Sequence, residues 1–418
     1  MAEGPLDAAV RVPGSKSITN RAYVLAALAS APTRVRAPLD SRDTRLMLAA
    51  LAALGARSEH TANGVLVHPA AAGQRGAGET VEIALGNAGT VARFTPALAA
   101  LGSSAVVFDG DDAIRRRPIG PLLGALRHLG ADIDDGGRGA PPFTVRGRGG
   151  VRGGKVDLDS SASSQFLSAL LLAAPAFDNG VTIRLVGGNP PSEPHIAMTL
   201  DMLRRFGATF DREGTEFYVA PSQLSCPGYQ VEPDLSTAAP FVVAAVAAGG
   251  SVHIAGWPQH TTQPGDWLRG LLEELGATVV LDSSGLTVTG GPTIQGAHLD
   301  LHEVGELTPV ISALLCFADT PSVITGVAHL RGHETDRLTA LATELSGLGA
   351  KVSETEDGLK ITPAPMHGGV FHTYDDHRLV MAGAVLGLRV RGVEVENPAT
   401  VGKTFPGFTE TWTDMVQS

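Results

Sequence analysis

The feature that most constrains the fold of this chain is a repeat along its length. A motif of the form Leu-x-x-Leu/Phe-Gly-Ala recurs roughly every 70 residues and begins at Leu51, Leu126, Leu203, Leu272 and Leu345. Glycine after the last apolar residue is the usual C-terminal cap of a helix, because glycine enters the left-handed region cheaply. Each copy therefore predicts a helix that ends at this glycine. Alternating residues such as 286–290 and 359–363 predict strands after it.

A second repeat interleaves with the first. A short polar cluster opens an apolar helix rich in small residues, and the six copies are 15–30, 86–101, 161–175, 234–250, 305–320 and 375–388. Six copies of one motif and five of the other leave one unit incomplete. The chain ends with a helix-like segment, 408–416, and begins with a strand-like one, 8–12. We expect the two termini to complete the sixth unit together.

These repeats favour a two-domain fold of the α/β (α+β) class. A solenoid is disfavoured because each unit holds helices and strands and no polar capping repeat is present. We expect two pseudo-threefold domains of three repeats each, with buried helices and mixed sheets outside. One domain would contain 1–14 and 234–418, and the other would be the insertion 15–233. The crossovers between them would act as hinges.

Composition excludes several classes of protein. The formal charge of −11 is unusual for a nucleic-acid binder, which commonly carries a basic face. No apolar run reaches the ~18 residues that span a bilayer, and the first residues lack the pattern of a secretory signal. Two cysteines, Cys226 and Cys316, cannot build a disulfide framework. We therefore expect a cytoplasmic protein.

The polar clusters lie where the apolar helices begin, and such positions attract anions because backbone N–H groups and the helix dipole point there. Simple N-capping is the alternative for any one cluster. Three clusters carry more than a cap requires: Lys16, Ser17 and Arg21 in PGSKSITNR; Asn87 and Gly89 in GNAGT; and Ser163, Ser164 and Gln165 in SSASSQF. We interpret them as candidate anion sites.

Further charged residues occur in short polar motifs. They are Arg117 in RRRPIG, His333, Glu334 and Arg337 in HETDR, Arg378 in DDHR, Lys403 in GKTF, and Glu303 and Glu306 in LHEVGEL. A planar guanidinium suits a carboxylate or a phosphate, although a solvated arginine run or a helical ion pair also explains such motifs. A phosphate-transferring kinase is disfavoured because both candidate Walker A loops lack a required residue. No metal site is suggested.

Seven of these motifs in order resemble the EPSP synthase (3-phosphoshikimate 1-carboxyvinyltransferase) family, from about residue 8 to 415. They are PGSKSITNR, GNAGT, RPIG, SSASSQF, ETDRL, DDHR and GKTFP. The resemblance implies two inverse α/β domains with the substrates in the interdomain cleft. It also implies transfer of the enolpyruvyl group of phosphoenolpyruvate to the 5-hydroxyl of shikimate 3-phosphate, a step in aromatic amino-acid biosynthesis. No cofactor is expected, and a monomer is the simplest assembly.

The resemblance also implies a role for each motif residue. Those expected to bind phosphoenolpyruvate are Lys16, Asn87, Gly89, Arg117, Gln165, Arg337, Arg378 and Lys403. Those expected to bind shikimate 3-phosphate are Lys16, Ser17, Arg21, Ser163, Ser164, Gln165, Ser192, Glu306 and His333. We expect Glu306 to act as general base, with Glu334 and Lys16 as proton carriers. Which of the three carries each proton stays open.

Four positions depart from the commonest pattern of the family. Glu306 stands where many members have Asp, His333 where many have Lys, His195 where many have Tyr and His329 where many have Asn. His333 would hold the sugar phosphate either as a cation or as a neutral hydrogen-bond donor, and both remain open.

Two other functions compete with this interpretation. UDP-N-acetylglucosamine enolpyruvyl transferases use a loop cysteine, but neither Cys226 nor Cys316 lies between the GNAGT and RPIG motifs. A non-catalytic scaffold would not explain why Lys16, Glu334 and Lys403 are all present.

Overall fold

Six sheets and two groups of buried helices form the computed structural model, which describes residues 2, 4–70 and 80–418. The chain divides into two compact units. We call residues up to Pro13 together with Glu232–Ser418 the terminal unit, because it holds both chain ends, and Gly14–Val231 the inserted unit. Over the described residues, none of the helices has the length and apolar character needed to cross a membrane.

The inserted unit has three buried helices in contact with one another: α1 (Lys16–Leu28), α3 (Gly89–Ala100) and α6 (Ser164–Ala173). Its other helices are α2 (Arg42–Ala53), α4 (Asp112–Arg115), α5 (Gly120–His128), the 3-10 helix η1 (Ala174–Ala176) and α7 (Glu193–Arg205). Its three sheets, in hydrogen-bonded order, are β13 (Gly228–Gln230), β2 (Thr33–Arg36), β4 (Gly64–His68) and β3 (Arg57–Thr61); β5 (Val81–Ala84), β6 (Ala105–Asp109), β8 (Phe143–Arg146) and β7 (Asp132–Asp134); and β11 (Phe210–Glu213), β12 (Glu216–Val219), β10 (Val181–Val186) and β9 (Gly154–Asp159).

The terminal unit repeats this plan with α8 (Leu235–Ala248), α10 (Thr308–Leu315) and α12 (His377–Leu386) buried. Its other helices are η2 (Pro264–Trp267), α9 (Leu268–Glu274), η3 (His302–Leu307), η4 (Ala328–Gly332), α11 (Arg337–Gly347), η5 (Pro398–Lys403) and α13 (Phe408–Gln417). Its sheets are β1 (Leu6–Val10), β14 (Gly250–Ala255), β16 (Gly285–Thr289) and β15 (Thr278–Leu281); β17 (His298–Asp300), β18 (Ser322–Thr325), β20 (Leu359–Thr362) and β19 (Lys351–Glu354); and β21 (Gly369–Phe371) with β22 (Val393–Val395).

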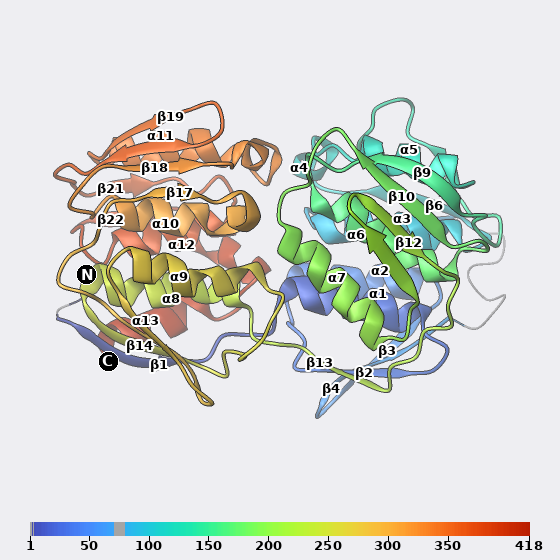
Figure 1. Cartoon of the computed structure of the whole chain (residues 1–418), viewed down its shortest axis with the longest axis horizontal. Coiled ribbons are helices and arrows are strands. Elements are labelled where there is room, and N and C mark those ends of the chain that lie inside the picture. Colours follow the sequence, from blue (N-terminus) through green and yellow to red (C-terminus); the bar gives the residue numbers. More distant parts are fainter. Residues whose placement is uncertain (1, 3, 71–79) are drawn as a thin grey trace. The chain divides into compact units, whose positions relative to one another are not determined.

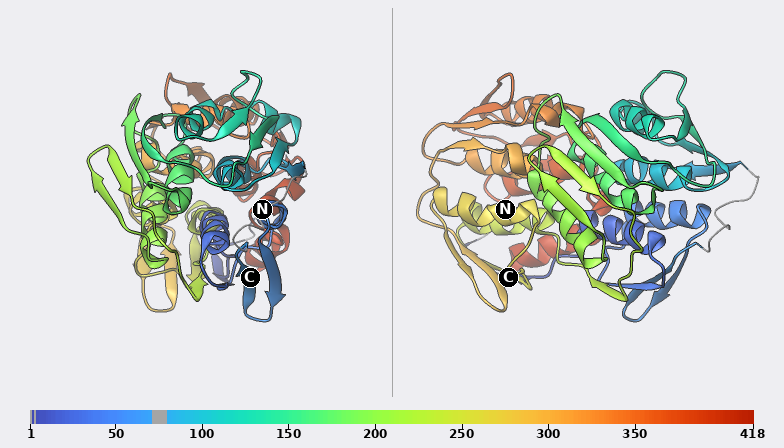
Figure 2. Two further views of the ribbon diagram at one scale, coloured as in Figure 1. Left: turned by 90° about the vertical axis from the view of Figure 1, so that its right-hand side faces the viewer. Right: turned by 45° about the vertical axis from the view of Figure 1, so that its right-hand side comes forward.

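Each complete repeat has the order strand, buried helix, parallel strand, outer helix and antiparallel hairpin. In the repeat β5–α3–β6–α5–β7–β8, β5 pairs parallel with β6, and β8 pairs antiparallel with both β6 and β7. Strands lie at the outside of each unit and helices between them, in Figure 1 and from the two further directions of Figure 2. The predicted class, inverse α/β with mixed outer sheets, is confirmed.

The first strands of two repeats are exchanged between the units. β1 precedes α1 in the chain but pairs parallel with β14, in the sheet of the terminal unit that accompanies α8. In the same way β13 precedes α8 but pairs parallel with β2, in the inserted unit. Each exchanged strand therefore takes the place of the first strand in a repeat whose helices lie elsewhere in the sequence.

This exchange corrects the predicted role of the termini. Both chain ends do lie in one unit, and α13 packs against β1. However, β1 belongs to the four-stranded sheet of β14 and does not complete the sixth repeat. The sixth repeat is β21–α12–β22–α13, and its sheet has two strands because no hairpin follows α13. Sequence periodicity could not reveal this, since strand pairing depends on contacts far apart in the chain.

Burial and backbone geometry explain why the two sequence repeats behave differently. The buried helices are apolar on every side; in α8, residues 235 to 247 are all buried. A helix that is apolar all round belongs in the core. The outer helices end at the repeated glycines, which have left-handed φ angles of 84° to 109° (Gly55 95°, Gly130 109°, Gly207 84°, Gly276 100°, Gly349 102°). Both predicted helix types are thus confirmed.

Candidate active site

The N-terminal ends of the buried helices differ in how their backbone N–H groups are satisfied. Four of these helices begin with a side-chain cap: Ser15 on α1, Ser163 on α6, Asp234 on α8 and Asp376 on α12. Helix α3 begins after Ala88 and has no side-chain cap. Capping alone therefore accounts for part of the polar clusters but not for the one at α3.

Two guanidinium groups flank the first residue of α3. A Cβ atom placed on Gly89 would lie 2.6 Å from Nη1 of Arg93 and 2.9 Å from Nη2 of Arg117. Nη1 of Arg93 donates to the Gly89 carbonyl at 3.2 Å, and Nη1 of Arg117 donates to the Asn87 carbonyl at 3.4 Å. Two cations at an uncapped helix N-terminus make a strongly positive site.

Buried polar atoms near this helix also lack hydrogen-bond partners among the described residues. They are Nε of Arg93, Oδ1 of Asn87 and Oε1 of Gln165. Arg93 is 5% exposed and lies over the Phe166 ring at 5.5 Å. Burial, followed by the charge of Arg117, holds the pKa of Arg93 well below its usual value. Such groups are costly in a folded protein unless a ligand or water pairs with them.

Arg21 on α1 is held by neutral oxygens. Its guanidinium donates to Thr199 Oγ1 at 2.8 Å, to the Ser17 carbonyl at 3.0 Å and to Ser168 Oγ at 3.3 Å. The side chain is buried, and burial lowers the pKa of Arg21 to about 10. The predicted spacing of Ser17 and Arg21 on one face of the helix is thus present as a direct contact.

Lys16 and the serines complete the predicted residues of the inserted unit. Lys16 Nζ lies 3.6 Å from Asp43 Oδ2, and both side chains are largely shielded from solvent. Ser163 caps α6 by accepting from the Gln165 N–H at 3.3 Å, and Ser164 is buried beside it. Ser192 is buried with a left-handed φ of 60° at the start of α7. Left-handed backbone in a non-glycine residue is sparsely populated and often marks a functional loop.

In the terminal unit, Arg337 forms a buried ion pair. Its Nε and Nη2 donate to the two oxygens of Asp376 at 2.8 and 3.1 Å, and both side chains are almost fully shielded. Burial lowers the pKa of Arg337, but the charge and hydrogen bonds of Asp376 more than offset it, so the net shift is upward. Nη1 of Arg337 also lies 3.2 Å from Nδ1 of His333. Because a guanidinium only donates, this contact favours a neutral His333 with its proton on Nε2.

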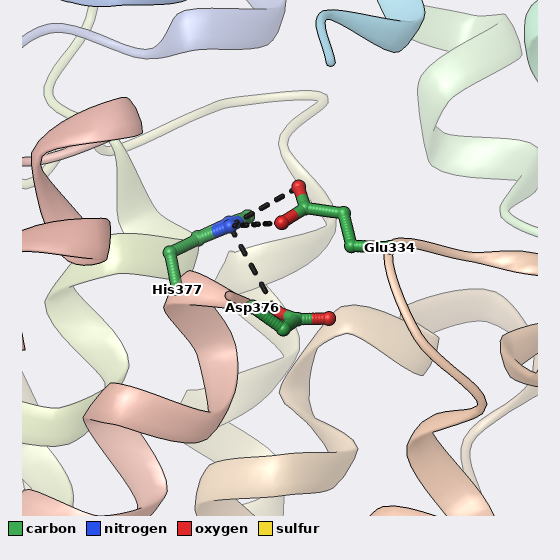
Figure 3. Close-up of side chains that lie close together, drawn as sticks. All are labelled: Glu334, Asp376 and His377. Atoms are coloured by element: carbon green, nitrogen blue, oxygen red, sulfur yellow. Dashed lines mark hydrogen bonds and ion pairs between the residues drawn. The ribbon is translucent and has the colours of Figure 1, made fainter. Parts of the chain in front are cut away.

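Glu334 is the centre of a second group of charges. Lys403 Nζ lies 3.3 Å from Glu334 Oε2, and Nδ1 of His377 lies 3.2 Å from the same carboxylate. His377 faces Asp376 as well, at 3.8 Å, as Figure 3 shows. The lysine also donates to the carbonyl of Asp375 at 2.6 Å. The predicted Glu334 and Lys403 are therefore in contact.

The donor set of Glu334, Asp376 and His377 could in principle hold a metal ion, since their ligand atoms lie within 4.8 Å of one another. Each carboxylate, however, already faces a cation: Arg337 on Asp376 and Lys403 on Glu334. A divalent ion would be placed beside two positive charges. The arrangement is better suited to fixing a histidine and moving protons than to binding a metal.

Glu306 lies at the start of α10, in η3. It accepts a hydrogen bond from Ser236 Oγ at 3.1 Å, and burial raises its pKa above the usual value. Arg378, itself buried, donates to the carbonyl of the same Ser236 at 2.7 Å. Burial lowers the pKa of Arg378. A carboxyl with a raised pKa is suited to general base chemistry near neutral pH.

The histidines at the unusual positions form a row beside these groups. The rings of His302 and His329 are 6.0 Å apart, and those of His329 and His333 are 5.8 Å apart. Burial, then the charges of His302 and Arg337, lowers the pKa of His329 to about 4. His329 is therefore neutral at physiological pH.

Within each unit, the structure brings most sequence-predicted residues to the starts of buried helices, and it adds others. Arg93, Ser236, Asp376 and His377 were missed, although each lies within a motif or one turn beyond it. Arg93 follows Gly89 by four residues, so helical spacing alone could have placed it beside that glycine. Of the RRRPIG arginines, Arg115 is instead a surface residue, paired with Asp109 and Asp112.

Comparisons with known proteins were made with this geometry in view. A sequence profile of EPSP synthase (3-phosphoshikimate 1-carboxyvinyltransferase) matches residues 1–412. The chain is 52% identical over 426 aligned positions to a 3-phosphoshikimate 1-carboxyvinyltransferase of Kocuria rhizophila, with 99% of this chain and 95% of that protein covered. A solved EPSP synthase from Acinetobacter baumannii is similar at 26% identity with a TM-score of 0.83, covering 99% of this chain and 97% of the other. The enolpyruvyl transferase NikO from Streptomyces tendae shares the fold, with a TM-score of 0.78 at 16% identity and coverage of 99% and 96%.

Proposed function

Because the chain belongs to the EPSP synthase family, we propose that it transfers the enolpyruvyl group of phosphoenolpyruvate to the 5-hydroxyl of shikimate 3-phosphate. The products are 5-enolpyruvylshikimate 3-phosphate and inorganic phosphate, and the reaction is a step of the shikimate pathway to aromatic amino acids. The structural observation that carries this function is the pair of guanidiniums at the uncapped start of α3. Both substrates are anions, and this site offers cations with few counter-charges.

Phosphoenolpyruvate carries a phosphate and a carboxylate, and the proposed residues supply charge for both. In the inserted unit they are Lys16, Asn87, Gly89, Arg117 and Gln165, and in the terminal unit Arg337, Arg378 and Lys403. The buried amide oxygen atoms of Asn87 and Gln165 and the buried Nε of Arg93 support this assignment, because a ligand or its water shell would satisfy them. We add Arg93 to the set.

Shikimate 3-phosphate is assigned to the hydroxyl-rich helix starts. The proposed residues are Lys16, Ser17, Arg21, Ser163, Ser164, Gln165 and Ser192, with Glu306 and His333 from the terminal unit. Arg21 is already fixed by four neutral acceptors, so its charge is available to a phosphate without breaking an ion pair. Hydroxyl and backbone donors at a helix start are well suited to phosphate oxygens.

The reaction needs two proton transfers and few covalent steps. The 5-oxygen of the sugar adds to C2 of phosphoenolpyruvate and loses its proton, while C3 gains a proton and becomes a methyl group. The C2–O bond to phosphate then breaks, and C3 returns a proton. We propose that Glu306 takes the hydroxyl proton, and that Glu334 and Lys16 carry the protons at C3. The raised pKa of Glu306 supports its role as a base, and the His377 contact supports a proton-carrying role for Glu334.

We further propose that the enzyme acts in the cytoplasm and as a monomer. Each unit supplies its own buried helices and sheets without a partner chain, and residues of both units are assigned to the two substrates. Sedimentation or light scattering of the purified protein tests the monomer.

The test is release of inorganic phosphate from phosphoenolpyruvate, with and without shikimate 3-phosphate. We expect release that requires shikimate 3-phosphate and that falls at least ~100-fold in Glu306→Gln and in Lys403→Ala, because each loses a proton acceptor or a cation of the transition state. The matched controls are Glu273→Gln on α9 and Lys360→Ala on β20, both exposed side chains. Release with UDP-N-acetylglucosamine in place of shikimate 3-phosphate would move the chain to the sister family.

A further inference from the structure

The loop between β21 and α12 has an unusual backbone. Tyr374 and Asp375 both have left-handed φ angles, 52° and 55°. Two consecutive non-glycine residues in this region persist only where surrounding contacts hold them. The question is therefore which contacts hold this loop, and what the loop holds in turn.

One buried carboxylate fixes the start of the loop. Glu344 on α11 is 6% exposed, and both of its oxygens accept from loop residues. Tyr374 Oη donates to Oε1 at 2.6 Å, and the N–H of His372 donates to Oε2 at 3.0 Å, with the His372 ring nitrogen Nδ1 at 3.1 Å. The hydrogen bond to Glu344, then burial, raises the pKa of Tyr374 to about 12, so the phenol stays a donor at physiological pH.

The end of the loop is fixed by the same helix. Asp376 pairs with Arg337, which is also on α11. Arg337 and Glu344 are seven residues apart, two turns of helix, and so lie on one face. Helix α11 therefore holds the loop at two points, one on each side of the left-handed pair.

Between these points, Asp375 contacts both ends of η5. Its Oδ1 accepts from Asn397 Nδ2 at 2.7 Å, and Asn397 is the residue before η5, with a left-handed φ of 41°. Its carbonyl oxygen accepts from Nζ of Lys403, the last residue of η5, at 2.6 Å. The carbonyl can meet the ammonium because of the left-handed turn at this residue.

We infer that Tyr374 and Asp375, anchored by Glu344, are positioning residues that fix the ammonium group of Lys403 for phosphoenolpyruvate. The inference rests on the proposed function, which assigns Lys403 to that substrate. None of the three residues needs to touch a substrate: Glu344 holds Tyr374, the held loop presents the Asp375 carbonyl, and that carbonyl directs Lys403. A cation held in place in advance loses less conformational entropy when the anion binds.

Tyr374→Phe tests the inference, because it removes the tether to Glu344 and keeps the ring. We expect the KM for phosphoenolpyruvate to rise about 5- to 20-fold, as for loss of a hydrogen bond to a charged group, with the KM for shikimate 3-phosphate changed less than about 2-fold. Tyr218→Phe is the matched control, since Tyr218 and Tyr374 are equally exposed at 44%. Melting temperatures of both variants are measured alongside.

Two outcomes would overturn the inference. One is a Tyr374→Phe enzyme that matches the Tyr218→Phe control in both KM values. The other is a parallel rise of both KM values with a lowered melting temperature, which indicates a structural role alone. Glu344→Gln, which keeps the side-chain shape, is expected to repeat the phosphoenolpyruvate-specific rise. If that variant does not fold, the exposed Tyr374 still decides the question.

A double variant tests whether the effect passes through Lys403. In a Lys403→Ala background, Tyr374→Phe should change the KM for phosphoenolpyruvate less than about 2-fold, because the group it positions is gone. Multiplicative effects would contradict positioning of Lys403. Absence of phosphate release by the wild-type enzyme with shikimate 3-phosphate would refute the proposed function. Normal wild-type release with unaffected variants refutes this inference alone.

Discussion

The two units bury their cations in opposite ways. In the terminal unit, Arg337 and Lys403 each contact a carboxylate, Asp376 and Glu334 respectively. In the inserted unit, the hydrogen bonds of Arg21 and Arg93 go to hydroxyl and carbonyl oxygens, and no carboxylate pairs with either among the described residues. All but the lysine are nearly inaccessible to solvent.

This contrast separates two tasks. A buried cation that lacks a counter-charge is costly, so the inserted unit gives up stability to keep positive charge for anionic substrates. The terminal unit keeps carboxylates beside its cations, and carboxylates are the groups that can accept and return protons. The same helical framework thus provides charge in one unit and proton chemistry in the other.

The largest expected effect breaks the paired side of the comparison. Asp376→Asn keeps the N-cap of α12 but leaves Arg337 buried without its counter-charge. We expect the free energy of unfolding to fall by about 3–5 kcal/mol, measured by urea denaturation of the substrate-free protein. The matched control is Asp157→Asn, since Arg184 binds Asp157 with the same two nitrogens at 2.8 and 2.6 Å but at the surface. That exposed pair should lose no more than about 1 kcal/mol, and equal losses would contradict the assignment.

The next effect has the opposite sign and breaks the other side. Arg93→Met removes a buried charge and leaves an apolar side chain against Phe166. We expect the substrate-free protein to gain about 1–3 kcal/mol of unfolding free energy, while the KM for phosphoenolpyruvate rises about 10- to 100-fold.

The control for this variant is Arg204→Met, because Arg204 also lies over an aromatic ring, that of Phe210, but on an exposed face. It should change neither property appreciably. A destabilised Arg93→Met protein would mean that Arg93 is a structural residue and not a charge kept for a ligand.

Much of the fold could be predicted from the sequence because its signals are local. The repeated Leu-x-x-Leu-Gly-Ala motif marks helix ends, and Gly55 and Gly349 have the left-handed φ that such a motif requires. The exchange of β1 and β13 could not be predicted in this way. Strand pairing joins residues more than 190 positions apart, such as Arg34 with Gly228, and leaves no periodic signal in either segment.

Site residues were predictable where a motif holds the residue itself. Lys403 and Glu334 were found within motifs, and their contact is present. The partners that tune them were not, because their effect depends on packing: Ser236 meets Glu306 across 70 positions, and Glu344 meets Tyr374 across 30. The family resemblance named the residues that meet substrate, while the structure adds those that set their charge and orientation.

The smallest expected effect sharpens the assignment of proton chemistry to the terminal unit. Burial raises the pKa of Glu306, and the hydrogen bond from Ser236 partly opposes this by stabilising the ionised form. Ser236→Ala therefore raises the pKa of Glu306 further. Because the base must be ionised, activity is lost as pH falls through this raised value, and the acid limb of the pH profile moves to higher pH.

At pH 6 we expect a loss of about 2- to 5-fold in kcat, with almost none at pH 8, where Glu306 is ionised in both enzymes. Steady-state phosphate release across this range provides the measurement. Ser251→Ala is the control, because Ser251 bonds only an exposed threonine, Thr289, on the neighbouring strand. An equal loss at both pH values would show that Ser236 supports the Arg378 backbone contact instead of the charge of Glu306. A shifted limb would place the base in the terminal unit, whose carboxylates the comparison sets apart.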